Sequence, residues 1–218
     1  LSTPDSREGW ASLAQRLEVK SIHISEQDTQ VTHLEKQRGC FYNTWSVEGL
    51  LSEGIQPAEL GWGTHEKSLP TLGRYHEFGC QSAIYLEKPG LSTRVRSWAP
   101  KAGPFLGHLI THHEAISISD YLTLRHQDQV TYRPTVHYSY HPCHHALLSI
   151  HELLGDQQRR PSQTRILRDE LVEGVDELGV LLLGHPKGAY WYGSQLTLAE
   201  ARNIAPLNSA TSLQIAAG

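Results

Sequence analysis

The chain has 218 residues, enough for one domain with a hydrophobic core. Its formal net charge is -4 and its isoelectric point is about 6.4, so it lacks the basic character of a nucleic-acid-binding protein. Mean hydropathy is -0.41 and no apolar run approaches the ~20 residues that span a bilayer, which argues against a helical membrane protein.

In chain order, the sequence opens with an amphipathic helix and then alternates strands with loops. Trp10, Leu13 and Leu17 fall on one face of the first segment, whereas Ile22 and Ile24 alternate in the second. Proline and glycine interrupt the stretch after position 54. The predicted elements are a helix at 6–19, a strand at 21–25, a polar loop at 28–39, a strand at 40–44, a short helix at 47–51 and an irregular segment at 54–73.

The second half has more strand patterns and one long helix. That helix carries the apolar residues Leu147, Ile150 and Leu154, and Gly155 is well placed to end it. The predicted elements are strands at 82–86 and 93–98, an apolar segment at 105–111, hairpin arms at 121–124 and 130–132, a helix at 144–154, a polar connection at 157–163, paired strands at 178–183 and 189–192, and a helix opened by the capping box TLAE at 197–200. This order predicts one α+β domain with a mixed β-sheet and flanking helices.

Cysteine usage and the chain ends indicate where the protein resides and how much of it is present. Cys40, Cys80 and Cys143 are odd in number and widely spaced, which favours reduced thiols in the cytoplasm. The first residues, LSTPDSREGW, are polar and show no signal peptide. The chain contains no methionine, and its last residues look like the beginning of a helix. We therefore expect a chain truncated at both ends, with processing as the alternative.

Residues 43–67, NTWSVEGLLSEGIQPAELGWGTHEK, combine tryptophans and carboxylates with glycine-rich turns. An aromatic face attracts a cation through its ring quadrupole, and a carboxylate attracts it through charge. The candidate ligands for a cation are Trp45, Glu48, Glu53, Trp62, His65 and Glu66. The alternative is a surface loop with two structural tryptophans.

Histidine is the unusual feature of the composition, with 14 residues. His137, His141, His144 and His145 crowd one segment, and a metal site is one interpretation of them. Pro142 favours a helix start at that point, and no H-E-x-x-H or C-x-x-C pattern is present. We therefore predict no metal and interpret these histidines as solvent-facing or hydrogen-bonded structural groups.

A dinucleotide-binding turn is not evident in the sequence. Gly61 and Gly63 begin a Gly-x-Gly-x-x-Gly pattern, but Glu66 occupies the position of the third glycine. No transition from strand to helix accompanies it. The chain by itself therefore lacks the phosphate cradle that a dinucleotide requires.

A series of distinctive motifs extends over nearly the whole chain. They are NTWSVEG, SEGIQPAELGWGTHEK, HEFGC, AIYLEKPG, RVRSW, THHEAISISDYLT, YRPTVHYSYHPC, DELGVLLLGH and GAYWYGS. The series resembles bacterial homospermidine synthase, of the saccharopine dehydrogenase-like superfamily. The resemblance implies that residues 1–218 are the substrate-binding and dimerisation domain, and that an NAD-binding half lies upstream. It also implies that two putrescines are joined into homospermidine, with release of ammonia, through imines.

The resemblance implies three residues with roles in the chemistry. Trp45 would lie against a cationic or iminium centre, and Glu53 would bind or deprotonate an ammonium. His112 would shuttle protons near neutral pH. Each has an ordinary structural alternative, because Trp45 could belong to the core, Glu53 could end a short helix and His112 could cap one.

The resemblance also implies residues that bind the amine. They are Glu26, Trp45, Glu53, Glu114 and Asp176. Glu26 follows a predicted strand and would anchor a terminal ammonium, although an ordinary strand-end carboxylate is the alternative. Glu114 would either tune His112 or bind amine. Tyr138 and Tyr140 are suited to line a polyamine tunnel, or equally to pack between strands.

The sequence departs from the family pattern at a few positions, among them Ser68 and His113, and either change would alter amine selectivity if it lined the pocket. The implied partners are putrescine and related polyamines, in a cytoplasmic homodimer without nucleic acid or membrane. Two other functions stay open. One is a non-catalytic polyamine-binding or assembly module, and the other is a histidine-rich metal-binding protein.

Overall fold

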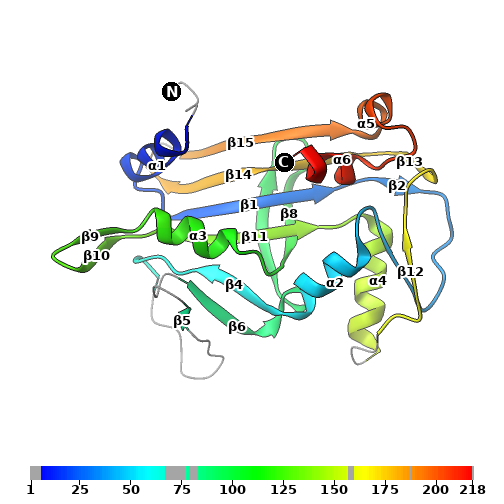
Figure 1. Cartoon of the computed structure of the whole chain (residues 1–218), viewed down its shortest axis with the longest axis horizontal. Helices are drawn as coiled ribbons and strands as arrows, with labels where there is room; N and C mark the ends of the chain where they lie inside the picture. Colours follow the sequence, from blue (N-terminus) through cyan, green and yellow to red (C-terminus); the bar gives the residue numbers. More distant parts are fainter. Residues whose placement is uncertain (1–5, 67–76, 79–82, 157–159, 187, 218) are drawn as a thin grey trace.

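The computed structural model describes residues 6–66, 77–78, 83–156, 160–186 and 188–217, and its centre is one large sheet (Figure 1). Its strands are β1 (Ser21–Asp28), β4 (Pro57–Gly61), β5 (Glu77–Phe78), β6 (Ala83–Pro89), β7 (Arg94–Ala99), β8 (Gly103–Leu109), β11 (Thr135–His141), β14 (Val175–His185) and β15 (Gly188–Thr197). The order is β15-β14-β1-β11-β4-β6-β5, with β8 paired to β11 and β7 to β8. β1 and β11 are parallel and the other pairs are antiparallel, so the predicted mixed sheet is confirmed.

The helices gather at the ends and on the faces of this sheet. They are α1 (Arg7–Arg16), α2 (Val47–Ile55), α3 (Glu114–Tyr121), α4 (His144–Gly155), α5 (Leu198–Ile204) and α6 (Ala210–Ala217), with a 3-10 turn at Gly90–Ser92. Figure 1 shows α1 at one end of the long axis and α4 and α5 at the other. The predicted capping box is confirmed, because Thr197 and Glu200 cap α5 reciprocally.

Three small two-stranded sheets complete the described chain. The hairpin joins β9 (Leu124–His126) to β10 (Gln129–Tyr132), β12 (Gln163–Ile166) pairs with β3 (Cys40–Asn43), and β13 (Leu171–Glu173) pairs with β2 (Val31–Thr32). The hairpin turns through Gln127 and Asp128, which have φ angles of 47° and 64°. Its first arm begins later than predicted, since Tyr121 is still helical.

The irregular segment predicted at 54–73 is wrong in part. β4 lies inside it as a strand between β11 and β6, and its remainder beyond Glu66 lies outside the described residues. Pro57 is tolerated because it is the first residue of the strand. Gly61 ends the strand where α3 crosses closely, so that a Cβ there would lie 2.5 Å from the Ala115 carbonyl oxygen. α3 itself was not predicted.

The core lies between the sheet and the helices. Phe41, Leu50 and Ile150 are buried in its main cluster together with Ile24 of β1. Side chains on a strand alternate between faces, so Ile22, Ile24, Glu26 and Asp28 share one face of β1. This row therefore changes from apolar to acidic along a single buried strand. Within the described residues, no helix is both long and apolar enough to cross a bilayer.

Candidate active site

A cavity of about 460 Å³ lies over the acidic end of β1. Five of the six residues predicted to bind or transform an amine line it. They are Glu26, Trp45, Glu53, His112 and Glu114. Glu26 lies on β1. Trp45 lies two residues before α2, and Glu53 lies within that helix. His112 precedes α3, and Glu114 is its first residue. The fold thus brings together segments more than eighty residues apart.

Glu26 is the most deeply buried acid of this cavity, with 4% of its surface exposed. The Tyr138 hydroxyl donates a hydrogen bond to its Oε2, while Oε1 has no partner among the described residues. Burial raises the pKa of Glu26 to about 7; the bond from Tyr138 opposes this shift, and the carboxylates of Asp28 and Glu53 add to it. A bound ammonium would supply both the missing partner and the missing positive charge.

His112 stands between two carboxylates. Its Nδ1 lies 2.5 Å from Oε2 of Glu114, and its Nε2 lies 3.8 Å from Oε2 of Glu53. Because a carboxylate only accepts, Glu114 holds the proton on Nδ1 and leaves Nε2 directed toward Glu53. This geometry suits a proton shuttle whose second nitrogen, Nε2, is directed toward Glu53 in the cavity.

The two carboxylates differ in their electrostatic environment. Burial raises the pKa of Glu53, and Glu114 adds to the effect while His112 opposes it. Burial acts to raise the pKa of Glu114, but the hydrogen bond to His112, a backbone hydrogen bond and the charges of His112 and His113 together bring the pKa below the usual value. Glu53 is therefore the better proton acceptor of the pair, and Glu114 is better suited to orient the imidazole.

Trp45 is held by its indole nitrogen, which donates a 3.0 Å hydrogen bond to the Tyr140 hydroxyl. The two rings also meet edge to face, with centroids 6.1 Å apart. Tyr140 is fully buried in the core, whereas Trp45 is only partly buried and lines the cavity. The core thus anchors a tryptophan whose ring remains available to a cation.

Asp176 was predicted as an amine ligand, but the structure does not place it among the lining residues of the cavity. It is fully buried on β14 and pairs in register with Asp28. Burial raises its pKa, and Glu26 and Asp28 raise it further, against the hydrogen bonds from Gln214 and Thr211. Asp28, which we did not single out from the sequence, completes a group of three buried acids. The sequence could have indicated it, because a residue two positions after Glu26 on the same strand lies on the same face of the sheet.

The other part of the tryptophan-rich segment lies away from this cavity. Glu66 accepts a 2.6 Å hydrogen bond from Thr135, and His65 lies 3.4 Å from Glu66. The main-chain oxygen of Trp62 accepts a hydrogen bond from Arg133 at 2.6 Å. Residues 43–66 therefore form two structural regions, and only the first contributes residues to the cavity that Glu26 lines.

The histidines of the second half do not converge. The ring of His137 contacts that of His23 in a tilted arrangement, with centroids 4.0 Å apart and planes inclined by 44°, and burial lowers the pKa of His23 to about 4. His145 instead bonds to the Leu34 carbonyl oxygen at 2.8 Å. Among the described residues, no three His, Cys, Asp or Glu side chains gather to hold a metal. The side chain of His113 is 86% exposed and does not line the cavity, whereas Ser68 lies outside the described residues.

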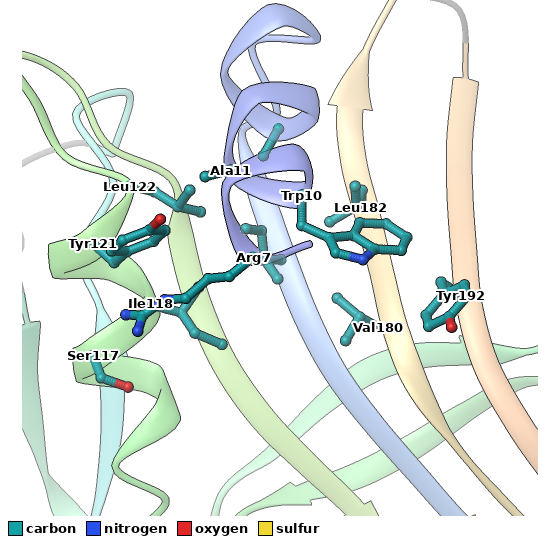
Figure 2. Close-up of a pocket in the computed structure, with 12 residues that line it drawn as sticks. Arg7, Trp10, Ala11, Ser117, Ile118, Tyr121, Leu122, Val180, Leu182 and Tyr192 are labelled. Carbon is teal, nitrogen blue, oxygen red and sulfur yellow. The ribbon is translucent and has the colours of Figure 1, made fainter. Parts of the chain in front are cut away.

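A second cavity, of about 470 Å³, continues along the apolar end of β1 and shares Val180 with the first. Figure 2 shows Trp10 and Tyr192 on one side of it and Tyr121 on the other. The Arg7 guanidinium lies over the Tyr121 ring, 4.1 Å from its centroid. None of the described residues that line this groove is acidic. Binding of a dication is therefore favoured at the acidic end of β1.

The chain is similar to known proteins over nearly its whole length. The profile of the saccharopine dehydrogenase C-terminal domain family matches residues 9–204. Homospermidine synthases of Mesorhizobium japonicum and Blastochloris viridis are each 56% identical over 97% of the chain, which spans 44% and 45% of their lengths. A crystal structure of homospermidine synthase from Legionella pneumophila in complex with NAD is 51% identical, with a TM-score of 0.90, over 98% of this chain and 47% of that one. The chain thus spans about half the length of these relatives.

Proposed function

The chain belongs to the saccharopine dehydrogenase C-terminal domain family, and on that premise we propose that it is the amine-binding half of a homospermidine synthase. The observation that carries this proposal is the convergence of Glu26, Trp45 and Glu53 on one cavity. Two carboxylates and an indole face suit a diammonium substrate such as putrescine. In this proposal residues 1–218 form the substrate-binding domain.

We assign the binding of NAD to the half of such an enzyme that lies outside residues 1–218. After Gly61 and Gly63 the described chain enters a loop rather than a helix, so the phosphate-binding turn is not formed there. Bound NAD would supply the hydride chemistry, by taking a hydride from the amine-bearing carbon and returning it to the new imine. Residues 1–218 would bind, orient and deprotonate the amines.

Each cavity residue then has a task set by its chemistry. Glu26 holds the distal ammonium of the first putrescine, because its free Oε1 is an acceptor without a partner among the described residues. Glu53 and His112 remove a proton so that the reacting amine is neutral. The ring of Trp45 stabilises the iminium that follows. The second putrescine attacks the iminium carbon through its neutral amine nitrogen. His112 then returns a proton to the original nitrogen on that carbon, which leaves as ammonia.

Product analysis of the natural gene product that contains this chain tests the proposal. Incubation with putrescine and NAD should yield homospermidine and ammonia, as detected by mass spectrometry. Trp45→Ala and Glu53→Gln should abolish the product. Glu48→Gln is the matched control, because this glutamate is exposed on the same helix as Glu53 and lies outside the cavity.

Two results would contradict this function. One is the absence of product from folded protein that binds NAD. The other is wild-type turnover in the Trp45 and Glu53 variants. Tight putrescine binding without turnover would instead support a non-catalytic polyamine-binding module.

We extend the proposal to a cytoplasmic homodimer. Cys40 and Cys143 are buried free thiols, which agrees with a reducing compartment. Leu106 and Leu148 are 47% and 37% exposed, and a second copy of the chain could cover such side chains. Light scattering should give twice the mass of the gene product, and the mass of a single copy would contradict the dimer.

A further inference from the structure

α6 places one polar side chain, Gln214, at the amine cavity, and both polar atoms of its side chain have partners. Its Nε2 donates to Oδ2 of Asp176 at 2.6 Å and to the Asp176 carbonyl oxygen at 2.9 Å. Its Oε1 accepts a 2.5 Å hydrogen bond from Ser194. Gln214 is 8% exposed, so these bonds form away from water. Its orientation is therefore fixed, and its two donors are directed at Asp176.

Asp176 is a buried acid whose side-chain hydrogen-bond partners among the described residues, Gln214 and Thr211, are both neutral. Besides Gln214, its donor is the Thr211 hydroxyl, 3.1 Å from Oδ1. No salt bridge formed by the described residues involves Asp176, Asp28 or Glu26. A carboxylate without a bound cation is the natural counter-charge for a cation that enters the adjacent cavity.

Two of the three buried residues of α6, Thr211 and Gln214, are polar, and hydrogen bonds link the helix to the surroundings of the same acids. Gln30, which bonds to Asp28, also donates to the Thr211 hydroxyl at 2.9 Å and accepts from Ala210 N at 2.7 Å. α6 therefore docks through hydrogen bonds to the residues around the acids. We therefore interpret α6 as a helix that orients the buried acids Asp28 and Asp176 through hydrogen bonds.

We propose that Gln214 is a positioning residue that holds Asp176, opposite Asp28 on the neighbouring strand, as a second counter-charge to Glu26 and so strengthens the binding of diamines. This inference rests on the proposed amine function of the cavity. An amide that donates to a carboxylate favours its ionised form and fixes its direction. A dication held by Glu26 then gains additional attraction from Asp176.

The pH dependence of this effect has a definite sign. Asp176 faces the titratable groups of Glu26 and Asp28 on β1 and of Tyr138 and Tyr140 on β11, whereas α6 carries none. Burial and the neighbouring acids hold the pKa of Asp176 well above its usual value, and the Gln214 bond opposes this rise. Without that bond the pKa rises further, so Asp176 ionises only at a higher pH and diamine affinity falls. Raising the pH ionises Asp176 in the variant too and restores the affinity.

Calorimetric titration of the natural gene product with putrescine tests this inference. Gln214→Met keeps the length of the side chain and removes both donors. We expect the dissociation constant to rise about tenfold at neutral pH, because a hydrogen bond to a charged group is lost. The ratio of the variant's dissociation constant to that of the wild type should shrink toward one as the pH is raised, because Asp176 is then ionised in both proteins.

Gln195→Met is the matched control, because Gln195 contacts the neighbouring carboxylate on the opposite face of β14. It donates to Oε1 of Glu177 at 2.6 Å, an arrangement that parallels the bond to Asp176 outside the cavity. This variant should bind putrescine like the wild type. Thr211→Val is a second test variant if Gln214→Met does not fold, since it also removes a donor to Asp176 and should weaken binding in the same direction.

Infrared spectroscopy gives a readout that needs no ligand. In a pH series, the protonated-carboxyl band of Asp176, identified by its absence from Asp176→Asn, should disappear at a higher pH in Gln214→Met than in the wild type. Wild-type affinity together with an unshifted band would overturn this inference and leave the amine function standing. A loss of affinity that is equal at every pH, with an unshifted band, would also overturn it, because it indicates a change of shape only. Failure of the wild type itself to bind putrescine would overturn the amine function together with this inference.

Discussion

The imidazole of His112 stacks on the phenol ring of Tyr138, with centroids 4.1 Å apart and planes inclined by 14°. The hydroxyl of the same tyrosine donates a hydrogen bond to Glu26. One side chain of β11 therefore sets both the plane of the proposed proton shuttle and the direction of the proposed ammonium ligand. The two functions of the cavity are geometrically linked through Tyr138.

Tyr138→Phe should separate these two roles, because it keeps the stacked ring and removes the hydroxyl. The bond to Glu26 lowers the pKa of that acid, so its loss should raise the pKa above about 7. Putrescine affinity should fall roughly three- to tenfold at neutral pH and recover as the pH rises. Calorimetric titration across this range measures it, and an affinity equal to wild type at every pH would contradict the role of Tyr138.

Glu26→Gln should stabilise the fold at mildly alkaline pH while it abolishes diamine binding. The folded-state pKa of Glu26 is raised from 4.5 to about 7, so its contribution to stability is fully present below 4.5 and is lost as the pH rises through 7. A neutral glutamine avoids this loss, which amounts to about 3 kcal/mol as an upper bound. Denaturant unfolding at several pH values measures the difference, which should vanish in acid.

Glu48→Gln is the control for this stability measurement. Glu48 is exposed on α2, and its replacement should change the free energy of unfolding by less than about 0.5 kcal/mol. A Glu26→Gln variant that is no more stable than wild type near pH 8 would show that burial does not raise the pKa of Glu26.

His112→Gln should lower kcat by about 10² to 10⁴, the usual range for loss of a general acid–base group. Glu114→Gln should lower it less, because it leaves the imidazole in place but removes the acceptor at 2.5 Å that orients it. His113→Asn should retain wild-type turnover, since that side chain is 86% exposed. Steady-state kinetics of homospermidine formation would compare the three. Equal losses at His112 and His113 would contradict the assignment.

Gly61→Ala should destabilise the protein by about 1 to 3 kcal/mol through overpacking. The new Cβ would lie 2.5 Å from both the Ala115 carbonyl oxygen and the Ser119 Cβ, which forces α3 away from β4. Because Glu114 begins α3, turnover should fall as well. Gly155→Ala is the control, since nothing among the described residues lies within 4 Å of the position that its new methyl group would take. Thermal unfolding measures both variants.

The elements that were predicted well are those with strong local signals. The helix around Leu147 and Ile150 has an apolar face, and Thr197 with Glu200 forms a local cap. β4 and α3 were missed because they are short, and proline, glycine and β-branched residues weaken their local preference. Their mutual packing at Gly61 and Ala115 stabilises them instead.

The sequence by itself determined the α+β class from periodicity and the family from motifs that lie within short stretches of chain. The resemblance carried by those motifs, and not periodicity, singled out five of the residues that line the cavity of Glu26. Only the tertiary structure decided that Asp176 lies behind the cavity wall beside Asp28, and that Gln214 holds it there. The reason is physical: these groups meet through strand pairing and through a helix about 190 residues further along the chain than β1, and long-range pairing leaves no pattern in local spacing.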